Sequence, residues 1–88
     1  KPKAQSASEV AKENIMIAIT REGTIHINER PVEIASLKEI LKGMISKNPD
    51  REVVLIADQA SQSGMLVQVV DACNLSGAKK VSIAALND

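Results

Sequence analysis

The stretch REVVLIAD, residues 51–58, constrains the fold more than any other part of the chain. Successive side chains of a strand point to opposite faces of its sheet. Val53 and Leu55 therefore share one face, and Val54 and Ile56 share the other. A short strand that is apolar on both faces is typical of a sheet interior, with a neighbouring strand along each edge. The chain must therefore supply at least two further strands.

Two alternating stretches upstream supply a hairpin. NIMIAIT (residues 14–20) and TIHIN (residues 24–28) both place isoleucines at every second position, which is the period of a half-buried strand. Gly23 lies between them and can adopt the positive φ of a short hairpin loop. We predict an antiparallel pair that ends before Pro31, because proline cannot donate to a strand ladder. A last strand is predicted in KKVSIAAL, residues 79–86.

The period changes to that of a helix in two places. From Ile34 onwards the apolar stripe consists of Leu37, Ile40, Leu41, Met44 and Ile45. Ser36 and Glu39 could form a capping box at its start, unless the helix begins two residues earlier. The stripe of the second helix consists of Leu66, Val69, Val70 and Cys73. We expect Gly77 to end that helix at the C′ position.

The resulting order, ββαβαβ, predicts an α+β fold: a small mixed sheet with two helices packed on one face. Right-handed crossovers would carry the chain across the sheet in one direction, with the strand 53–57 between the strands 24–28 and 81–86. The helix-free face would be apolar enough to bind a second copy or another partner. Its candidate residues are Met16, Ala18, Val54, Ile56, Ser82, Ala84 and Leu86. The last strand would form an open sheet edge.

The composition is typical of one small soluble domain. The 88 residues include eleven basic and eleven acidic side chains and no Phe, Trp or Tyr. With no net charge and no rings to stack on bases, nucleic-acid binding is not expected. Residues 1–13 have the composition of a flexible linker, which leaves 14–88 as the globular domain. The chain begins at Lys1, so we expect it to be a piece of a longer protein.

Asp58, at the end of the central strand, is the first candidate for a catalytic or phosphorylated group. Such chemistry requires a second acidic, histidine or lysine side chain nearby. The chain offers Asp71 and His26 at no recognisable spacing. The simpler interpretation is that Asp58 accepts hydrogen bonds from turn amides, and that Ser63 and Gly64 shape the same turn. We therefore predict no catalytic, cofactor-binding or metal-binding residue.

The ordered motifs resemble the periplasmic domain of the ExbD/TolR family. The resemblance rests on Ala57-Asp58, on Gly64, on LVQVVDACNLSG at 66–77 and on KKVSIAAL at the end. The hairpin IAITREGTIHINERPV and the helix before NPD fit the order of the family, so about residues 14 to 86 are covered. Ser63 replaces an aromatic residue and Ala60 an acidic one, so partner contacts through those side chains are not carried over.

The resemblance implies a non-enzymatic part of an inner-membrane complex. The parent protein would cross the membrane once, bind an ExbB- or TolQ-like protein through that helix, and place this domain in the periplasm. There the domain would form a homodimer and capture a TonB- or TolA-like protein by strand addition, so that the proton motive force is transmitted. Peptidoglycan, a proposed partner of one branch, has no readable signal here, and the sequence does not separate the ExbD branch from the TolR branch.

Two alternatives remain open. Ser63-Gly64 at the start of a helix also resembles the phosphorylation-switched regulatory domains of the STAS type, although Gln62 stands where a second serine would be expected. A small enzyme or metabolite sensor built on Asp58 lacks a second catalytic group. Phosphate on Ser63 after incubation with a kinase would favour the regulatory interpretation.

Overall fold

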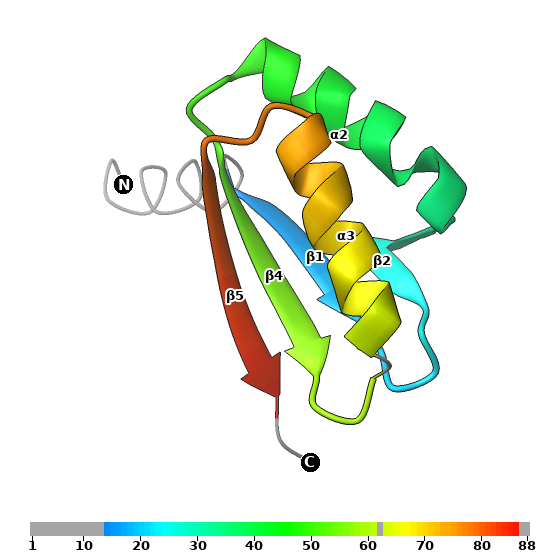
Figure 1. The fold of residues 1–88 in the computed structure, drawn as a ribbon. Coiled ribbons are helices and arrows are strands. Elements are labelled where there is room, and N and C mark those ends of the chain that lie inside the picture. The colour runs from blue at the N-terminus through cyan, green and yellow to red at the C-terminus, as the bar shows by residue number, and fades with distance from the viewer. Residues whose placement is uncertain (1–13, 62, 87–88) are drawn as a thin grey trace, which may run out of the picture.

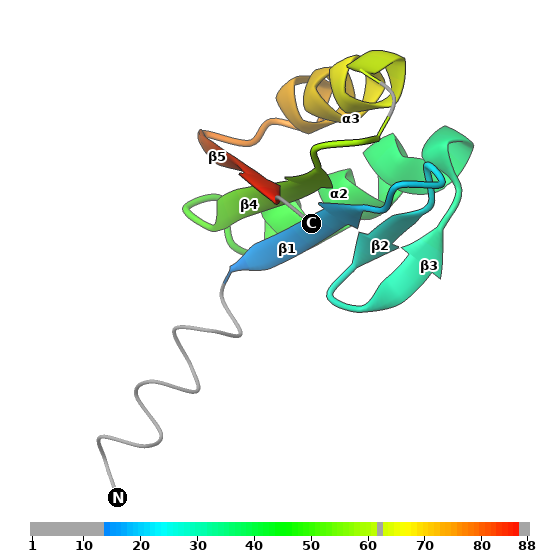
Figure 2. The ribbon, with the colours of Figure 1, turned by 90° about the horizontal axis from the view of Figure 1, so that it is seen from below.

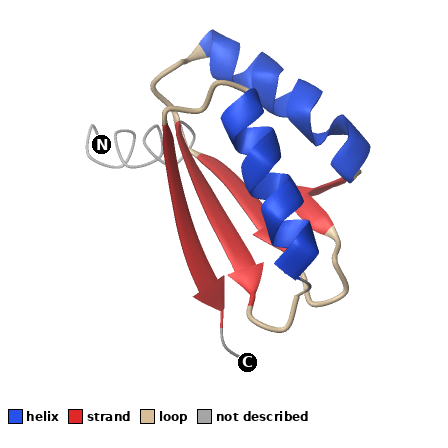
Figure 3. Cartoon of the chain, viewed as in Figure 1, coloured by secondary structure: helices blue, strands red, loops and turns tan. Residues whose placement is uncertain are grey.

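The computed structural model of the chain describes residues 14–61 and 63–86. Its elements are β1 (Ile15–Ile19), β2 (Ile25–Ile27), β3 (Arg30–Val32), α2 (Ile34–Lys47), β4 (Glu52–Asp58), α3 (Ser63–Leu75) and β5 (Lys80–Leu86). Within the described residues, two helices and a five-stranded mixed sheet form an α+β fold, as the sequence predicts (Figure 1). Figure 3 shows the same chain coloured by helix, strand and loop. The predicted linker, residues 1–13, lies outside the described residues.

The sheet has the strand order β3-β2-β1-β4-β5. β1 pairs antiparallel with β2, as the predicted hairpin requires, and β2 pairs antiparallel with β3. β4 runs parallel to β1 on one side and to β5 on the other. It therefore has a neighbour along both edges, which is the position that its two apolar faces predict.

The identity of one neighbour of β4 corrects the prediction. Residues 53–57 were expected beside the strand 24–28, but β4 pairs with β1 instead. The reason is a second hairpin that the sequence interpretation missed. Asn28 and Glu29 adopt φ values of 48° and 75°, and two successive positive φ values are what a two-residue type I′ turn requires. The chain returns as β3 and occupies the outer edge of β2.

β3 was not predicted from the sequence because it contains Pro31. A proline in a strand argues against an interior position, but an edge strand tolerates it. β3 is such an edge, with Pro31 opposite His26. The chain then passes through α2 from β3 to β4, and through α3 from β4 to β5. Both connections step in the same direction across the sheet, as expected.

Both α2 and α3 lie on one side of the sheet (Figure 2). The hydrophobic core of the described residues consists of side chains from this face of the sheet and from the two helices. Its largest fully buried side chains are Ile15, Ile17, Ile19, Leu37, Leu41, Leu55, Val53, Val69 and Cys73. The strand residues in this set alternate along β1 and β4, and the helix residues follow the predicted stripes. Burial also raises the pKa of the Cys73 thiol above its ordinary value, because a buried site disfavours the thiolate.

The two helices begin and end by different means. The capping box considered for Ser36 and Glu39 does not form, because α2 begins two residues earlier, at Ile34, which is the alternative that the sequence left open. Glu33 occupies the N-cap position without a side-chain hydrogen bond. α3 ends at Leu75, and Gly77, whose φ is 94°, occupies the C′ position as predicted. The N–H of Gly77 donates to Asn74 O and the N–H of Ala78 to Cys73 O, both at 3.3 Å, which is the Schellman pattern.

Candidate functional site

The candidate partner residues form rows across the helix-free face. Residues that are in register on neighbouring strands share a face of the sheet. Met16, Val54 and Ser82 are in register, and the next row joins Ala18, Ile56 and Ala84. The backbone of Leu86 is in register with Asp58. Met16 is 38% exposed, and Val54 and Ile56 are half-buried. The face is therefore partly apolar and open.

A cavity on this face adds two residues that were not among the predicted partner residues. His26 and Asn28 line it together with Met16, Ala18 and Ile56. The N–H of Met16 donates to Asn28 Oδ1 at 3.0 Å, and the N–H of Asn28 donates to Met16 O at 2.8 Å. The asparagine–glutamate turn brings these groups together. An asparagine at a predicted strand end was the available signal, because asparagine tolerates the left-handed conformation.

Asp58 shapes the turn after β4. Its Oδ1 accepts a hydrogen bond from the N–H of Ala60 at 2.8 Å, and its carbonyl oxygen accepts one from the N–H of Ser61 at 2.9 Å. This is an Asx turn. Among residues 14–61 and 63–86, no three His, Cys, Asp or Glu side chains gather as metal ligands. The Asp58 side chain therefore organises the backbone of this turn, and Asp58 lines a surface cavity together with Thr20, Arg21 and Glu22.

The start of α3 does not depend on the missing side chain of Gly64. Ser63 is the first residue of the helix, and Gly64 follows in its first turn. A Cβ atom built on Gly64 would meet no other atom within 4 Å. An alanine would therefore fit at this position without steric conflict.

The two edges of the sheet differ in their capacity to accept another strand. β3 has three residues and contains Pro31, which lacks a backbone donor. β5 has seven residues, KVSIAAL, without proline, and β4 is its one neighbour in the described sheet. The outward main-chain groups of β5 are a template for strand addition. β5 is therefore the better receptor of the two edges.

A groove runs between α3 and β5 on the helix-bearing side, and we name it the α3–β5 groove. It is lined by Leu66, Val67, Val70, Asp71, Asn74 and Ile83. Val67 is 66% exposed and Ile83 is 55% exposed. This groove was not predicted from the sequence. The available signal was Val67, an apolar residue outside the stripe that α3 buries.

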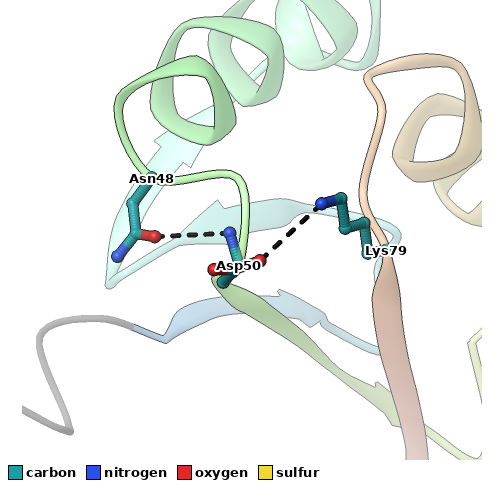
Figure 4. A network of polar contacts seen from close by, with 3 residues as sticks. All are labelled: Asn48, Asp50 and Lys79. Carbon is teal, nitrogen blue, oxygen red and sulfur yellow. Dashed lines mark hydrogen bonds and ion pairs between the residues drawn. The ribbon is translucent and has the colours of Figure 1, made fainter.

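Exposed polar contacts join the loops that precede β4 and β5. The N–H of Asp50 donates to Asn48 Oδ1 at 3.3 Å, and Lys79 Nζ lies 3.7 Å from Asp50 Oδ1 (Figure 4). The side chains of Lys79 and Asp50 are 65% and 88% exposed, so this ion pair contributes little to stability. Its position makes Asp50 a useful control residue that lies outside the α3–β5 groove.

The described part of the chain is a small α+β domain with an open β5 edge, a partly apolar helix-free face and a groove beside α3. The sequence matches the family model described as biopolymer transport protein ExbD/TolR over residues 1–88. The chain belongs to the ExbD/TolR family, as its motifs suggest. The proteins of this family serve transport and are not enzymes, in agreement with the prediction. No helix within residues 14–61 and 63–86 has the length and apolar character to cross a membrane.

Two curated relatives carry names from this family. The chain is 31% identical over 85 residues to biopolymer transport protein exbD2 of Vibrio cholerae, an alignment that covers 97% of this chain and 63% of the relative. It is 35% identical over 83 residues to biopolymer transport protein ExbD of Aquifex aeolicus, covering 93% of this chain and 61% of the relative. The chain therefore spans less than two thirds of the length of each.

Proposed function

We propose that this chain is the periplasmic domain of an inner-membrane protein in a proton-motive-force-coupled complex. The parent protein would bind an ExbB- or TolQ-like membrane protein through a segment other than the described domain. The domain itself would form a homodimer and capture a TonB- or TolA-like protein by strand addition. Membership in the ExbD/TolR family supports the general role in transport. The open edge of β5 is the observation that carries the capture step.

Strand addition requires a long edge with free main-chain donors and acceptors. β5 offers seven residues with no charged side chain after Lys80. The opposite edge offers three residues interrupted by Pro31. A captured segment therefore pairs with β5 and extends the sheet.

Dimerisation would use the helix-free face instead of the edge. Met16, Ala18, Val54 and Ile56 form the central rows of that face. Covering them with a second copy would remove apolar surface from water, which is the usual driving force of association. The two functions then use different surfaces, so a dimer can still capture a partner.

Backbone amide shifts of the 88-residue chain, measured by NMR, test the capture step. Peptides from the extended segments of TonB- and TolA-like proteins are titrated into the labelled chain. We expect the largest shifts in β5, at residues 80–86, and small shifts in β3. If neither β5 nor β3 shows amide shifts, the proposed capture by strand addition is wrong.

A charge-matched pair of variants sharpens this experiment. Ile83→Lys places a charge on the edge strand, a device that natural proteins use to block edge pairing. Ser46→Lys adds the same charge to the exposed end of α2. We expect the first variant to lose peptide binding and the second to retain it. The regulatory alternative on Ser63 has no support from the family match.

A further inference from the structure

We infer that the captured segment carries an aliphatic residue followed two positions later by a lysine or arginine, and that the α3–β5 groove recognises this pair. The inference rests on strand addition to β5, as proposed above. It adds the chemistry by which the domain would distinguish one extended partner segment from another.

The groove lies where side chains of an added strand would fall. Side chains of a strand alternate between the two faces of the sheet, so every second residue of a strand beside β5 points to the side that carries α3. Ile83 faces that side, because it is in register with the buried Leu55. An added strand would place its side chains outside Ile83, against the exposed flank of α3.

That flank presents one apolar position and one acidic position in a single row. Val67 and Asp71 are four residues apart, so both lie on the same side of the helix, and both line the groove. Their separation along the axis is about 6 Å at the usual helical rise. Two residues of a strand span nearly the same length, about 6.6 Å. Alternate side chains of an added strand can therefore meet Val67 and Asp71 in turn.

The direction of α3 sets the order of the two residues. α3 runs opposite to β5 (Figure 1), so Asp71 lies nearer the start of β5 and Val67 nearer its end. Antiparallel pairing is slightly more stable per residue than parallel pairing. An antiparallel strand meets Val67 first and Asp71 second, which gives the order aliphatic, any residue, basic. The side chain of the intervening residue points to the other face of the sheet, beside Ser82 and Ala84. Because these side chains are small, many residue types would fit at that position.

Charge favours a partner of this kind over a second copy of β5. Asp71 is the one charged residue among the described residues that line the groove. A second β5, added antiparallel, would present Val81, Ile83 and Ala85 on the same side, and none of these can neutralise the carboxylate. The chain itself contains Val10-Ala11-Lys12, which has the required order. This segment is the competing occupant that an experiment must exclude.

Four nine-residue host peptides that differ at two positions test the inference. They carry Ile-Thr-Arg, Ile-Thr-Glu, Ser-Thr-Arg or the reversed order Arg-Thr-Ile at their centre, and they are titrated into the labelled 88-residue chain. We expect the first to bind about fivefold more tightly than the second, from one exposed charge pair, and about tenfold more tightly than the third, from burial of the isoleucine. The reversed peptide should bind more weakly than the first.

Two exposed substitutions assign these differences to the groove. Asp71→Asn should abolish the preference for arginine over glutamate, whereas Asp50→Asn, outside the groove, should preserve it. Val67→Ser should reduce the preference for isoleucine over serine. The charge preference should also shrink at high salt, because exposed charges are screened.

The outcomes separate this inference from the proposed function. If all four peptides shift the β5 amides with equal affinity, strand addition stands and the recognition pattern is wrong. If no peptide shifts them, both fail. If the peptides bind the Lys12→Glu variant more tightly than the unchanged chain, the groove is occupied by the chain's own segment Val10-Ala11-Lys12, and the inference of a separate partner is wrong. A peptide-free dimer that protects the β5 amides would overturn it as well.

Discussion

Met16 and Asn28 exchange two hydrogen bonds, one from each backbone N–H, at 3.0 and 2.8 Å. Asn28 makes this contact at a φ of 48°. Asn28→Ala should therefore lose the hydrogen bond to Asn28 Oδ1. It also introduces a residue that tolerates the left-handed conformation less well than asparagine does, and the total cost should be about 2 kcal/mol. Urea denaturation measures the loss. Asn28→Gly keeps the conformational freedom and should cost less, and Asn28→Asp keeps the acceptor. Equal stability of the alanine variant and the unchanged chain would contradict the role of this turn.

Gly77 should be the glycine whose replacement destabilises the domain. Its φ of 94° is strained for any residue with a Cβ, so Gly77→Ala should lower the free energy of unfolding by about 1–2 kcal/mol. Gly43→Ala is the matched control, because Gly43 lies inside α2 with open space around its Cα. That variant should gain about 0.5–1 kcal/mol. Thermal and urea denaturation of both proteins measure the contrast, and losses of equal size would refute it.

The thiol of Cys73 should be unreactive in the folded protein and should make stability depend on pH. Burial raises its pKa above the ordinary value of 9.0, so the folded state holds the proton more tightly than the unfolded state. This contribution is fully present below the unfolded pKa and is lost as the pH rises through the folded pKa. Urea denaturation from about pH 7 to about pH 10 should show declining stability. The decline should be smaller in Cys73→Ala; an identical slope would contradict the assignment.

Met16 should matter for self-association if the helix-free face forms the dimer. Met16→Lys places a charge at the centre of that face, where the side chain is 38% exposed and the fold can accommodate it. We expect the dimer to weaken about tenfold in sedimentation equilibrium. Ser46→Lys carries the same added charge away from the face and should leave the dimer intact. Equal dissociation constants for both variants would exclude this face as the interface.

The spacing of hydrophobic residues along the sequence was sufficient to predict most of the strands and helices. The alternation of isoleucines predicted β1 and β2, and the helical stripes ending at Lys47 and Gly77 predicted α2 and α3. β3 was missed because three residues around Pro31 carry too little pattern to indicate a strand. That omission also misplaced β4, since the outer edge of β2 was thought to be free. Of the two predicted starts of α2, the earlier one is correct, because the helix begins at Ile34 and Ser36 lies inside it.

Of the candidate surfaces, the helix-free face was predicted from the sequence and the α3–β5 groove was not. Register across β1, β4 and β5 groups the predicted residues of the helix-free face, because alternation assigns each strand residue to one side. The α3–β5 groove was not predicted, because its existence depends on how far α3 extends over the sheet. Val81 packs against the core, whereas Ile83, two residues later on the same side, remains 55% exposed.

The sequence by itself determined both helices, the strands other than β3, and which of their sides are apolar, since these follow from the spacing of side chains along one backbone. It also determined the turn chemistry at Asp58 and Gly77, which involves neighbouring residues alone. Only the tertiary structure decided the order of strands and the surfaces left open. The strand order depends on which sheet edge is free when each strand pairs, and the open surfaces depend on where each helix packs on the sheet. Contacts between residues that are distant in sequence determine both. Asp71 and Ile83, twelve residues apart in sequence, line one groove for this reason.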